Sequence, residues 1–455
     1  MALDTQLLDA LRAVVGEAYL LTEDQVALID PGVDPENLAA GLAVRPGDVH
    51  EVAGIVLACG AAGVPLITHG GRTGLARAAV SEPGQIVLLT DRLDRLEIDA
   101  VERVATIGVG VTLETLQEAA AKHGLSPGID LAARGSATIG GLVSTNAGGM
   151  EAFRNGMMRQ RLLGMEAVLP DGSIFSDLVR VTKNNEGYDL KQLLCGAEGT
   201  LGVVTEVTIR LINADKPGQV VLAAIPSAEH ATRVMRALQD ARKLQFAEIM
   251  WAEYARIIAN ACGLDHVIGF CNAPCYVVYQ IEGALEDAAT LLEPWMENGT
   301  ILDAVIAQST READEIWRIR EDSFAVERVL PHKLWYDVSL PVTALDSYVA
   351  RLQAHLAETD PALVLSAMGH LADGNLHLTI GREAPIGPEL ADAVTRAVEV
   401  GIKDVGGSVS AEHGVGLSKL NTIARNTSPG KLAMMARIKA ALDPNGIMNP
   451  GKVIP

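Results

Sequence analysis

DLAARGSATIGGLVSTNAGGM, residues 130–150, is the stretch that decides the fold of this chain. It consists mainly of glycine and small side chains, and its only charges are Asp130 and Arg134. Because small side chains leave the backbone accessible, a large flat ligand can lie directly against such a stretch. The stretch therefore predicts a loop that binds a sizeable cofactor.

Two further glycine loops flank it in the sequence. THGGRTGLARAAV at 68–80 follows the strand-like VPLIT, and CGAEGTLGVVT at 195–205 leads into a strand. Glycine turns of this kind expose backbone N–H groups to an anion such as a pyrophosphate. Neither loop is a Walker motif or a G-x-G-x-x-G motif. For the first loop alone an ordinary tight turn is the alternative, but three such loops in one region favour a cofactor.

Length and charge limit the possible functions. The chain has 455 residues, enough for two or three domains, and a net charge of −20. So acidic a protein repels nucleic acid and anionic membranes, and a small anionic substrate needs a local cation. The longest apolar stretches are broken by Gly and Pro, so we expect no membrane span.

Five cysteines without a C-x-x-C pair exclude an iron–sulfur ligand run and favour reduced thiols. The N-terminal MALDTQLLDALRAVVG has helical spacing of apolar residues and lacks the basic start of a signal peptide. We therefore expect a cytoplasmic protein.

The texture of the chain suggests three segments. From residue 44 helix-like and strand-like pieces alternate, and INADKPG marks a boundary near residue 213. Helices are expected at 227–243, 284–297 and 311–328, and a last helix covers PGKLAMMARIKAALD. The domains expected are 1–212, 213–410 and 411–455.

GHLADGNLH, residues 369–377, places two histidines around an Asp-Gly pair. Asp373-Gly374 favours a type I′ hairpin turn, which would put His370 directly opposite His377, close enough to share one ion. Alternation then places Asn375, His377 and Thr379 on one polar face. A half-buried hairpin with two solvated histidines is the alternative.

SAEHGVG at 410–416 supplies a carboxylate for such a site. Two histidines and Glu412 would form a site with open positions, as catalytic Zn²⁺ prefers, with Mn²⁺ or Fe²⁺ as alternatives. Glu412 and His413 are adjacent, so both can face one site only if the strand ends there, and Gly414 and Gly416 permit that bend. A flavin-free metallohydrolase would use the same three ligands.

GGRTG, RGSATIGG with STNAGG, and YDLKQLLCGAEGTLGVVT together resemble the FAD-binding segments of the vanillyl-alcohol-oxidase/p-cresol-methylhydroxylase flavoproteins. Within that superfamily the chain resembles the FAD-linked D-2-hydroxyacid dehydrogenases, including D-lactate and D-2-hydroxyglutarate dehydrogenases. The resemblance implies an α+β fold, with a two-subdomain FAD-binding domain over 1–212 and an α+β cap domain over 213–410 that is built on an antiparallel sheet and carries the histidine hairpin. It also implies that the C-terminal segment, 411–455, returns to the FAD-binding domain. Relatives that attach FAD covalently use a histidine where this chain has Arg72, so we expect non-covalent FAD.

The same resemblance implies the residues that contact FAD. They lie in the three loops and the C-terminal tail: Gly70, Gly71, Arg72, Thr73, Gly74, Leu75, Pro127, Asp130, Gly135, Ser136, Thr138, Gly140, Gly141, Ser144, Asn146, Gly148, Glu198, Gly199, Gly202, Val203, Val204 and Asn449.

For the reacting centre the resemblance implies His370, His377 and Glu412 as metal ligands and His413 as general base. Arg320, in the W-x-x-R-E run, would bind the substrate carboxylate and act in catalysis. The remaining residues expected at the substrate are Asn375, Phe324, Trp335 and Tyr336.

Two departures bear on the substrate. Phe324 stands where the hydroxyglutarate enzymes carry a threonine, and Trp335 stands where they carry a lysine. Both changes remove polar contacts to a second carboxylate, so we expect an apolar D-2-hydroxy acid such as D-lactate, a longer aliphatic acid or D-mandelate. The alternatives are D-2-hydroxyglutarate or another polar acid, and simple packing of either aromatic in the cap core.

No second redox centre is visible in the sequence, so the electrons are expected to leave the flavin for an external acceptor, such as a quinone or an electron-transfer flavoprotein. A flavin-binding subunit of a larger oxidoreductase is the other reading, and a homodimer is the assembly considered.

Overall fold

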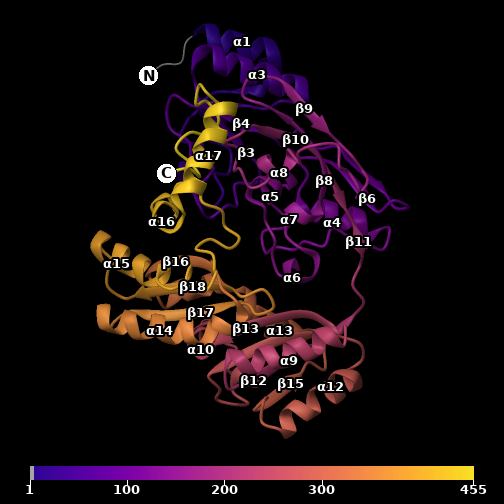
Figure 1. Cartoon of the computed structure of the whole chain (residues 1–455), viewed down its shortest axis with the longest axis vertical. Helices are drawn as coiled ribbons and strands as arrows, with labels where there is room; N and C mark the ends of the chain where they lie inside the picture. The colour runs from indigo at the N-terminus through magenta and orange to yellow at the C-terminus, as the bar shows by residue number, and fades with distance from the viewer. Residues whose placement is uncertain (1–4) are drawn as a thin grey trace. The chain divides into compact units, whose positions relative to one another are not determined.

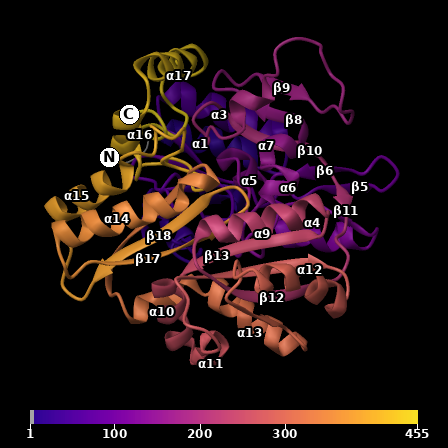
Figure 2. The same cartoon turned by 60° about the horizontal axis from the view of Figure 1, so that its bottom comes forward.

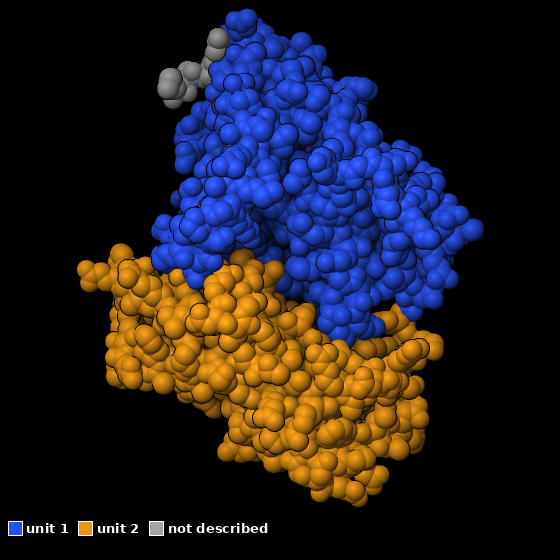
Figure 3. All heavy atoms as spheres, in the orientation of Figure 1, with its two compact units in different colours: residues 1–214, 412–455 blue, residues 215–411 orange. Residues whose placement is uncertain are grey.

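The computed structural model describes residues 5–455. The chain forms two compact units (Figure 3): unit 1 comprises residues 1–214 and 412–455, and unit 2 comprises residues 215–411. The first boundary lies two residues beyond the one expected from the sequence, and the second lies one residue beyond. The C-terminal segment of the chain therefore returns to the unit that holds the three glycine loops (Figure 1).

The first sheet of unit 1 has four strands in the order β1-β2-β4-β3, with β1 antiparallel to β2 and the rest parallel. Its strands are β1 (Leu20–Leu21), β2 (Ala43–Val44), β3 (Leu66–His69) and β4 (Ile86–Leu89). The helix α3 (Val49–Ala62) precedes β3. The Asp48 side chain caps its N-terminus, and Gly63 ends it in the left-handed conformation.

The second sheet of unit 1 is antiparallel, in the order β5-β6-β10-β8-β9. Its strands are β5 (Leu96–Asp99), β6 (Val104–Gly108), β8 (Leu162–Val168), β9 (Ile174–Asp177) and β10 (Val203–Arg210), and a small separate pair joins β7 (Leu125–Ser126) to β11 (Ile212–Asn213). Two sheets in one unit agree with the two-subdomain arrangement.

The remaining elements of unit 1 connect these sheets. They are α1 (Thr5–Val15), η1 (Glu17–Tyr19), α2 (Glu23–Val26), η2 (Pro35–Leu38), α4 (Leu113–Ala121), α5 (Ile139–Thr145), α6 (Ala152–Asn155), α7 (Met158–Arg161), α8 (Lys191–Leu194), α16 (Leu420–Asn426) and α17 (Pro429–Leu442).

Unit 2 is built on one seven-stranded antiparallel sheet in the order β15-β12-β14-β13-β17-β18-β16. The strands are β12 (Gly218–Ile225), β13 (Leu244–Trp251), β14 (Cys275–Glu282), β15 (Asp303–Ile306), β16 (His332–Ser339), β17 (Val364–His370) and β18 (Asn375–Arg382).

Helices cover both faces of this sheet (Figure 2). One face carries α9 (Ala228–Asp240), α14 (Leu345–Thr359) and α15 (Pro388–Glu399), and the other carries α10 (Ala252–Cys262) and α13 (Thr310–Glu321). The other elements are α11 (Asp265–Ile268), α12 (Leu285–Glu297), η3 (Ser323–Arg328) and η4 (Val342–Ala344).

The helix expected over 311–328 is shorter than predicted. It ends at Glu321, and a 3-10 turn follows over Ser323–Arg328. Asp322 leaves the helical conformation with a ψ of 51°, and Asp-Ser pairs favour such ends because their side chains compete for backbone hydrogen bonds. Over residues 5–455, none of the helices has the length and apolar character needed to cross a membrane.

Candidate functional site

In unit 1 the first two glycine loops are in direct backbone contact. A Cβ added to Gly71 would lie 1.8 Å from the Ser136 carbonyl oxygen, and one added to Gly70 would lie 2.3 Å from Thr138 Oγ1. Heavy atoms cannot approach so closely, so only glycine fits at both positions. The two loops that the sequence singled out therefore form one cradle immediately beyond β3.

The third loop and the C-terminal tail contact each other and the first two loops at this cradle. Asn449 Nδ2 donates to the carbonyl oxygens of Glu198, at 2.7 Å, and of Ala78, at 3.1 Å. The buried Lys452 donates to Val80 O and to Asn449 Oδ1. Glu198 N–H donates to Ser144 O at 2.8 Å, which ties in the second loop.

The carboxylate of Glu198 holds the returning chain. Its two oxygens accept the backbone N–H groups of Val415, at 2.7 Å, and Gly416, at 2.9 Å. Burial raises the pKa of Glu198, although these two N–H groups oppose the increase. One carboxylate therefore fixes the bend that Gly414 and Gly416 were expected to permit.

Backbone strain concentrates in these segments. Among residues 5–455, eight residues other than glycine have positive φ, and six of them lie in the three loops and the tail: Arg72, Arg77, Asn146, Glu198, Asn449 and Val453. Such conformations cost free energy and cluster at ligand sites.

One buried atom in the cradle lacks a partner. His69, the last residue of β3, donates from Nε2 to Ala79 O at 2.7 Å, while its buried Nδ1 has no hydrogen-bond partner in the structure. Burial lowers the pKa of His69 to about 3, so the ring is neutral and Nδ1 is an acceptor. A glycine cradle with an unsatisfied acceptor fits a cofactor with hydroxyl groups, as FAD has.

The expected FAD contacts all lie in unit 1. Val203 and Val204 belong to its hydrophobic core, so their side chains serve packing. Leu75, by contrast, is an exposed residue of the first loop.

In unit 2, two rows of side chains cross one face of the sheet, which we call the site face. The register places Ser339, Asn375, His370 and Glu248 side by side on four neighbouring strands, and a second row consists of Asp337, His377, Met368 and Met250. Alternation with the buried Leu376, Leu378 and Ile380 follows the predicted period of two along β18, so the polar face expected there is confirmed.

The predicted hairpin register is wrong. His370 pairs with Asn375, and His377 pairs with Met368, so the loop has four residues, 371–374. A type I′ turn needs positive φ at both central residues, and only Gly374 has it. Leu371 instead donates its N–H to Ala247 O of β13 and is fully buried, which lengthens the loop.

Despite this shift, the two histidines meet. Their Nε2 atoms are 3.4 Å apart and their rings are perpendicular, with centroids 5.2 Å apart. Two nitrogens bound to one tetrahedral Zn²⁺ at about 2.0–2.1 Å lie about 3.4 Å from each other. The imidazole pair therefore fits a shared divalent cation.

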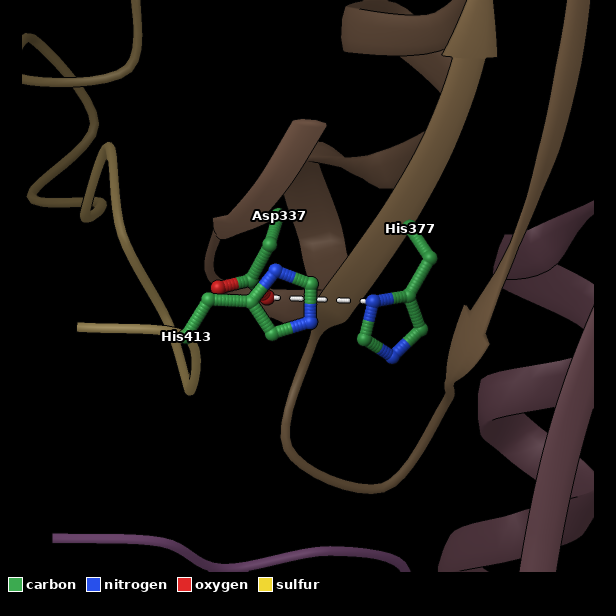
Figure 4. A group of neighbouring side chains, drawn as sticks. All are labelled: Asp337, His377 and His413. Atoms are coloured by element: carbon green, nitrogen blue, oxygen red, sulfur yellow. Dashed lines mark ion pairs between the residues drawn. The ribbon is translucent and has the colours of Figure 1, made fainter. Parts of the chain in front are cut away.

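A buried carboxylate lies behind each imidazole. Glu248 contacts Nδ1 of His370 at 2.8 and 2.9 Å. Asp337 Oδ1 lies 3.8 Å from Nδ1 of His377 (Figure 4) and also accepts from Asn375 Nδ2 at 2.9 Å. Each carboxylate residue is 1% exposed. Sequence reasoning missed both, although a glutamate inside the apolar strand LQFAEIMW was a usable signal.

Arg320 is engaged within unit 2. It is buried at the end of α13, and its Nε and Nη2 donate to Glu248 Oε2 at 2.8 and 2.5 Å. Burial alone would raise the pKa of Glu248, but Arg320 and His370 outweigh it and hold that pKa below its usual value. The expected role of Arg320 on a substrate carboxylate stays a prediction, because the Nε and Nη2 atoms of its guanidinium are directed at Glu248.

Phe324 and Trp335 come together. Their ring centroids are 5.7 Å apart, and the residues are 61% and 42% exposed, so packing in the core does not explain them. Trp335 lies two residues before Asp337 on β16 and shares the site face with it. Tyr336 faces the opposite side, where its hydroxyl bonds Thr395 of α15, so we do not place it with the substrate.

Glu412 and His413 begin the returning segment of unit 1. Glu412 Oε1 accepts the N–H of Gly149 in the second loop at 2.8 Å. The preceding residue, Ala411, ends unit 2, where its N–H donates to Asp337 Oδ2 at 3.1 Å.

Two family models match the chain: "FAD binding domain" over residues 40–177 and "FAD linked oxidases, C-terminal domain" over residues 215–453. D-2-hydroxyglutarate dehydrogenase of Xanthomonas citri pv. viticola is 35% identical, over 92% of this chain and 89% of that protein. The enzyme of the same name from Stutzerimonas stutzeri is 33% identical over 99% of both chains, and the mitochondrial one from Bos taurus is 32% identical over 96% of this chain and 84% of its own.

Solved structures show the same fold. 4-Ethylphenol oxidase from Gulosibacter chungangensis matches with a TM-score of 0.74 at 18% identity, over 99% of this chain and 97% of that one. p-Cresol methylhydroxylase matches with a TM-score of 0.73 at 18% identity, over 98% and 96%. The chain thus has the fold that its glycine loops implied, and it belongs to the FAD-linked oxidase family that includes the D-2-hydroxyglutarate dehydrogenases.

Proposed function

We propose that this chain uses FAD and a divalent metal to oxidise a D-2-hydroxy acid with an apolar side chain to the 2-oxo acid and passes the electrons to an external acceptor. D-Lactate, a longer aliphatic acid and D-mandelate are the substrates proposed. The observation that carries the proposal is the site face of unit 2, where the His370–His377 pair lies beside the exposed aromatic Trp335.

Within this proposal His370, His377 and Glu412 hold the cation, Zn²⁺ or alternatively Mn²⁺ or Fe²⁺. Such a cation, when bound, lowers the pKa of the substrate hydroxyl, and non-covalent FAD accepts the hydride at N5. His413 takes the hydroxyl proton as general base.

Two residues of unit 2 would orient the acid. Asn375 is buried next to His370, and its Oδ1 is a buried acceptor without a hydrogen-bond partner in the structure. An unsatisfied acceptor of this kind favours a ligand that donates, such as the substrate hydroxyl. Arg320 is proposed for the substrate carboxylate by resemblance.

D-2-Hydroxyglutarate is the second candidate substrate. The names of the relatives favour it, and so does Lys333, which shares the site face with Trp335 and lies with its Nζ 6.0 Å from the Trp335 ring centroid. Its ammonium also lies 3.0 Å from Glu327 Oε1, which would have to yield to a second substrate carboxylate.

Anaerobic reduction tests the function. The purified FAD-containing protein is mixed with single D- and L-2-hydroxy acids, and flavin absorbance is followed. We expect D-lactate, longer aliphatic D-acids or D-mandelate to bleach the flavin and their L-enantiomers to leave it oxidised.

The other outcomes are equally informative. Bleaching mainly by D-2-hydroxyglutarate would select the second candidate, and no bleaching by any acid would leave a flavin-binding subunit. A protein that stays colourless after reconstitution with FAD would contradict both.

A further inference from the structure

Glu248 is a fully buried charged side chain within a largely apolar strand. It lies on β13, is 1% exposed, and has Ile249 and Met250, both fully buried, as its next neighbours. A carboxylate in such a place costs several kcal/mol of desolvation unless it is paired. Its burial there therefore depends on the groups that pair with it.

The partners of Glu248 come from two elements, β17 and α13. Nδ1 of His370 on β17 contacts its two oxygens at 2.9 and 2.8 Å, and Arg320 at the end of α13 donates to Oε2. Arg320 is itself held, because its carbonyl oxygen accepts the hydroxyl of the buried Tyr254 of α10 at 2.9 Å. The Glu248 carboxylate is therefore held by Arg320 on one side and contacts His370 on the other.

This contact sets the tautomer of His370. An ionised carboxylate can only accept a hydrogen bond, so the Nδ1 that faces it at 2.8 Å carries the hydrogen. Arg320 Nη2 also lies 3.4 Å from Nδ1, but its much shorter contact, 2.5 Å, is with Glu248 Oε2. Were Nδ1 bare, its lone pair would face the carboxylate oxygens at 2.8 Å, which is repulsive. In the neutral ring the lone pair then lies on Nε2, the atom that lies 3.4 Å from Nε2 of His377.

We propose that Glu248 is a positioning residue that holds His370 in the Nδ1–H tautomer, with Nε2 directed at the cation. The inference rests on the metal site of the proposed function and adds Glu248 and its counter-ion Arg320 to it. Carboxylates behind metal-binding histidines commonly fix ring orientation and raise ligand basicity, and their loss costs about 10- to 100-fold in metal affinity.

The experiment measures cation affinity, which does not require turnover. The FAD-containing protein is stripped with a chelator and titrated with Co²⁺ through its visible absorption, with Zn²⁺ as competitor. We expect Glu248→Leu to weaken binding about 10- to 100-fold and Glu248→Gln to weaken it less, because the glutamine oxygen still accepts from Nδ1–H.

Loss of Glu248 leaves Arg320 buried and unpaired, so the single variants can misfold. The double variant Glu248→Met with Arg320→Met removes both charges at similar volume, which buried ion pairs often tolerate. Its cation affinity is expected to fall as in Glu248→Leu. Asp346→Asn is the matched control, because Asp346 caps α9 on the opposite face of the sheet and contacts no histidine ring.

A second readout separates positioning from mere stability. Imidazole ¹⁵N shifts of histidine-labelled, metal-free protein report the tautomer, and the His370 signal is identified by its loss in His370→Gln. We expect Nδ1–H in the parent chain and in Glu248→Gln, and a mixture of tautomers in the double variant.

The possible results separate the positioning role of Glu248 from the existence of the metal site. Unchanged affinity and tautomer in all folded Glu248 variants would overturn the positioning role while leaving the metal site standing. Failure of the parent chain itself to bind Co²⁺ or Zn²⁺, with His377→Ala no different, would overturn the metal site, and the inference with it.

Discussion

The expected substrate specificity depends on two residues, Phe324 and Trp335. The sequence predicts them from the resemblance alone, whereas the structure shows that they touch each other, remain exposed and adjoin the site face. Their meeting depends on the break at Asp322, after which the 3-10 turn presents Phe324 to β16. A continuous helix, as expected over 311–328, would have directed that side chain elsewhere.

The double variant Trp335→Lys with Phe324→Thr tests them. A hydrogen bond to a charged group contributes about 1.5–3 kcal/mol, so kcat/KM for D-2-hydroxyglutarate relative to D-lactate should rise by about 10- to 100-fold. Steady-state assays with an artificial electron acceptor measure the ratio.

Leu302→Lys is the control for added charge, because the exposed Leu302 adjoins β15, at the other edge of the sheet from β16. An equal change in the control, or no change in the double variant, would contradict the pocket assignment.

At the scale of elements, the predicted register of the β17–β18 hairpin was wrong, yet each side chain lies on the face of the sheet that was predicted for it. The predicted pairing of His370 with His377 and the observed pairing with Asn375 differ by two residues. Strand side chains alternate with a period of two, so an even shift leaves every residue on its original face, and the histidines become diagonal neighbours. The turn dipeptide could not reveal the shift, because the contact that causes it is made by Leu371 with β13.

A substitution in the glycine cradle tests the contact between its first two loops. In Gly71→Ala the new methyl group would lie 1.8 Å from Ser136 O, so the first two loops must separate. We expect a loss of about 1–3 kcal/mol in the stability of unit 1, and loss of FAD during purification. The ratio of flavin to protein absorbance measures retention.

Gly430→Ala is the matched control in the same unit, because a Cβ there meets nothing within 4 Å. Retention of FAD by Gly71→Ala at the level of this control would show that the cradle tolerates separation of its loops.

At the scale of the whole molecule, the buried histidine of the cradle couples folding to pH. Burial lowers the pKa of His69 from its ordinary value of 6.5 to about 3 in the folded state. Between these two pH values the unfolded chain binds a proton that the folded chain does not bind. The free energy of unfolding should therefore fall, as pH is lowered from about 6.5, by about 1.4 kcal/mol per pH unit from this group, with no contribution above that range.

Urea unfolding of the parent chain and of His69→Gln at pH 7.5, 6.5, 5.5 and 4.5 measures this dependence. The glutamine amide can still donate to Ala79 O, but it does not titrate. The variant should lose less stability on acidification, and parallel curves for both proteins would show that His69 does not contribute.

The sequence by itself determined the features that depend on neighbours along the chain. The glycine-rich loops and the period of two along β18 are local signals. The family resemblance adds the return of the C-terminal segment. They were enough for the fold, the FAD loops and the pair of histidines.

Only the tertiary structure decided which charges share the interior. Glu248, Arg320 and His370 are separated by 72 and 50 residues along the chain, yet they form one buried contact network. Sheet order brings β13 next to β17, and the packing of α13 brings its last turn to the same point. The physical reason is that desolvation forces a buried charge to find a partner, but strand neighbours, which are non-local, decide which partner is within reach.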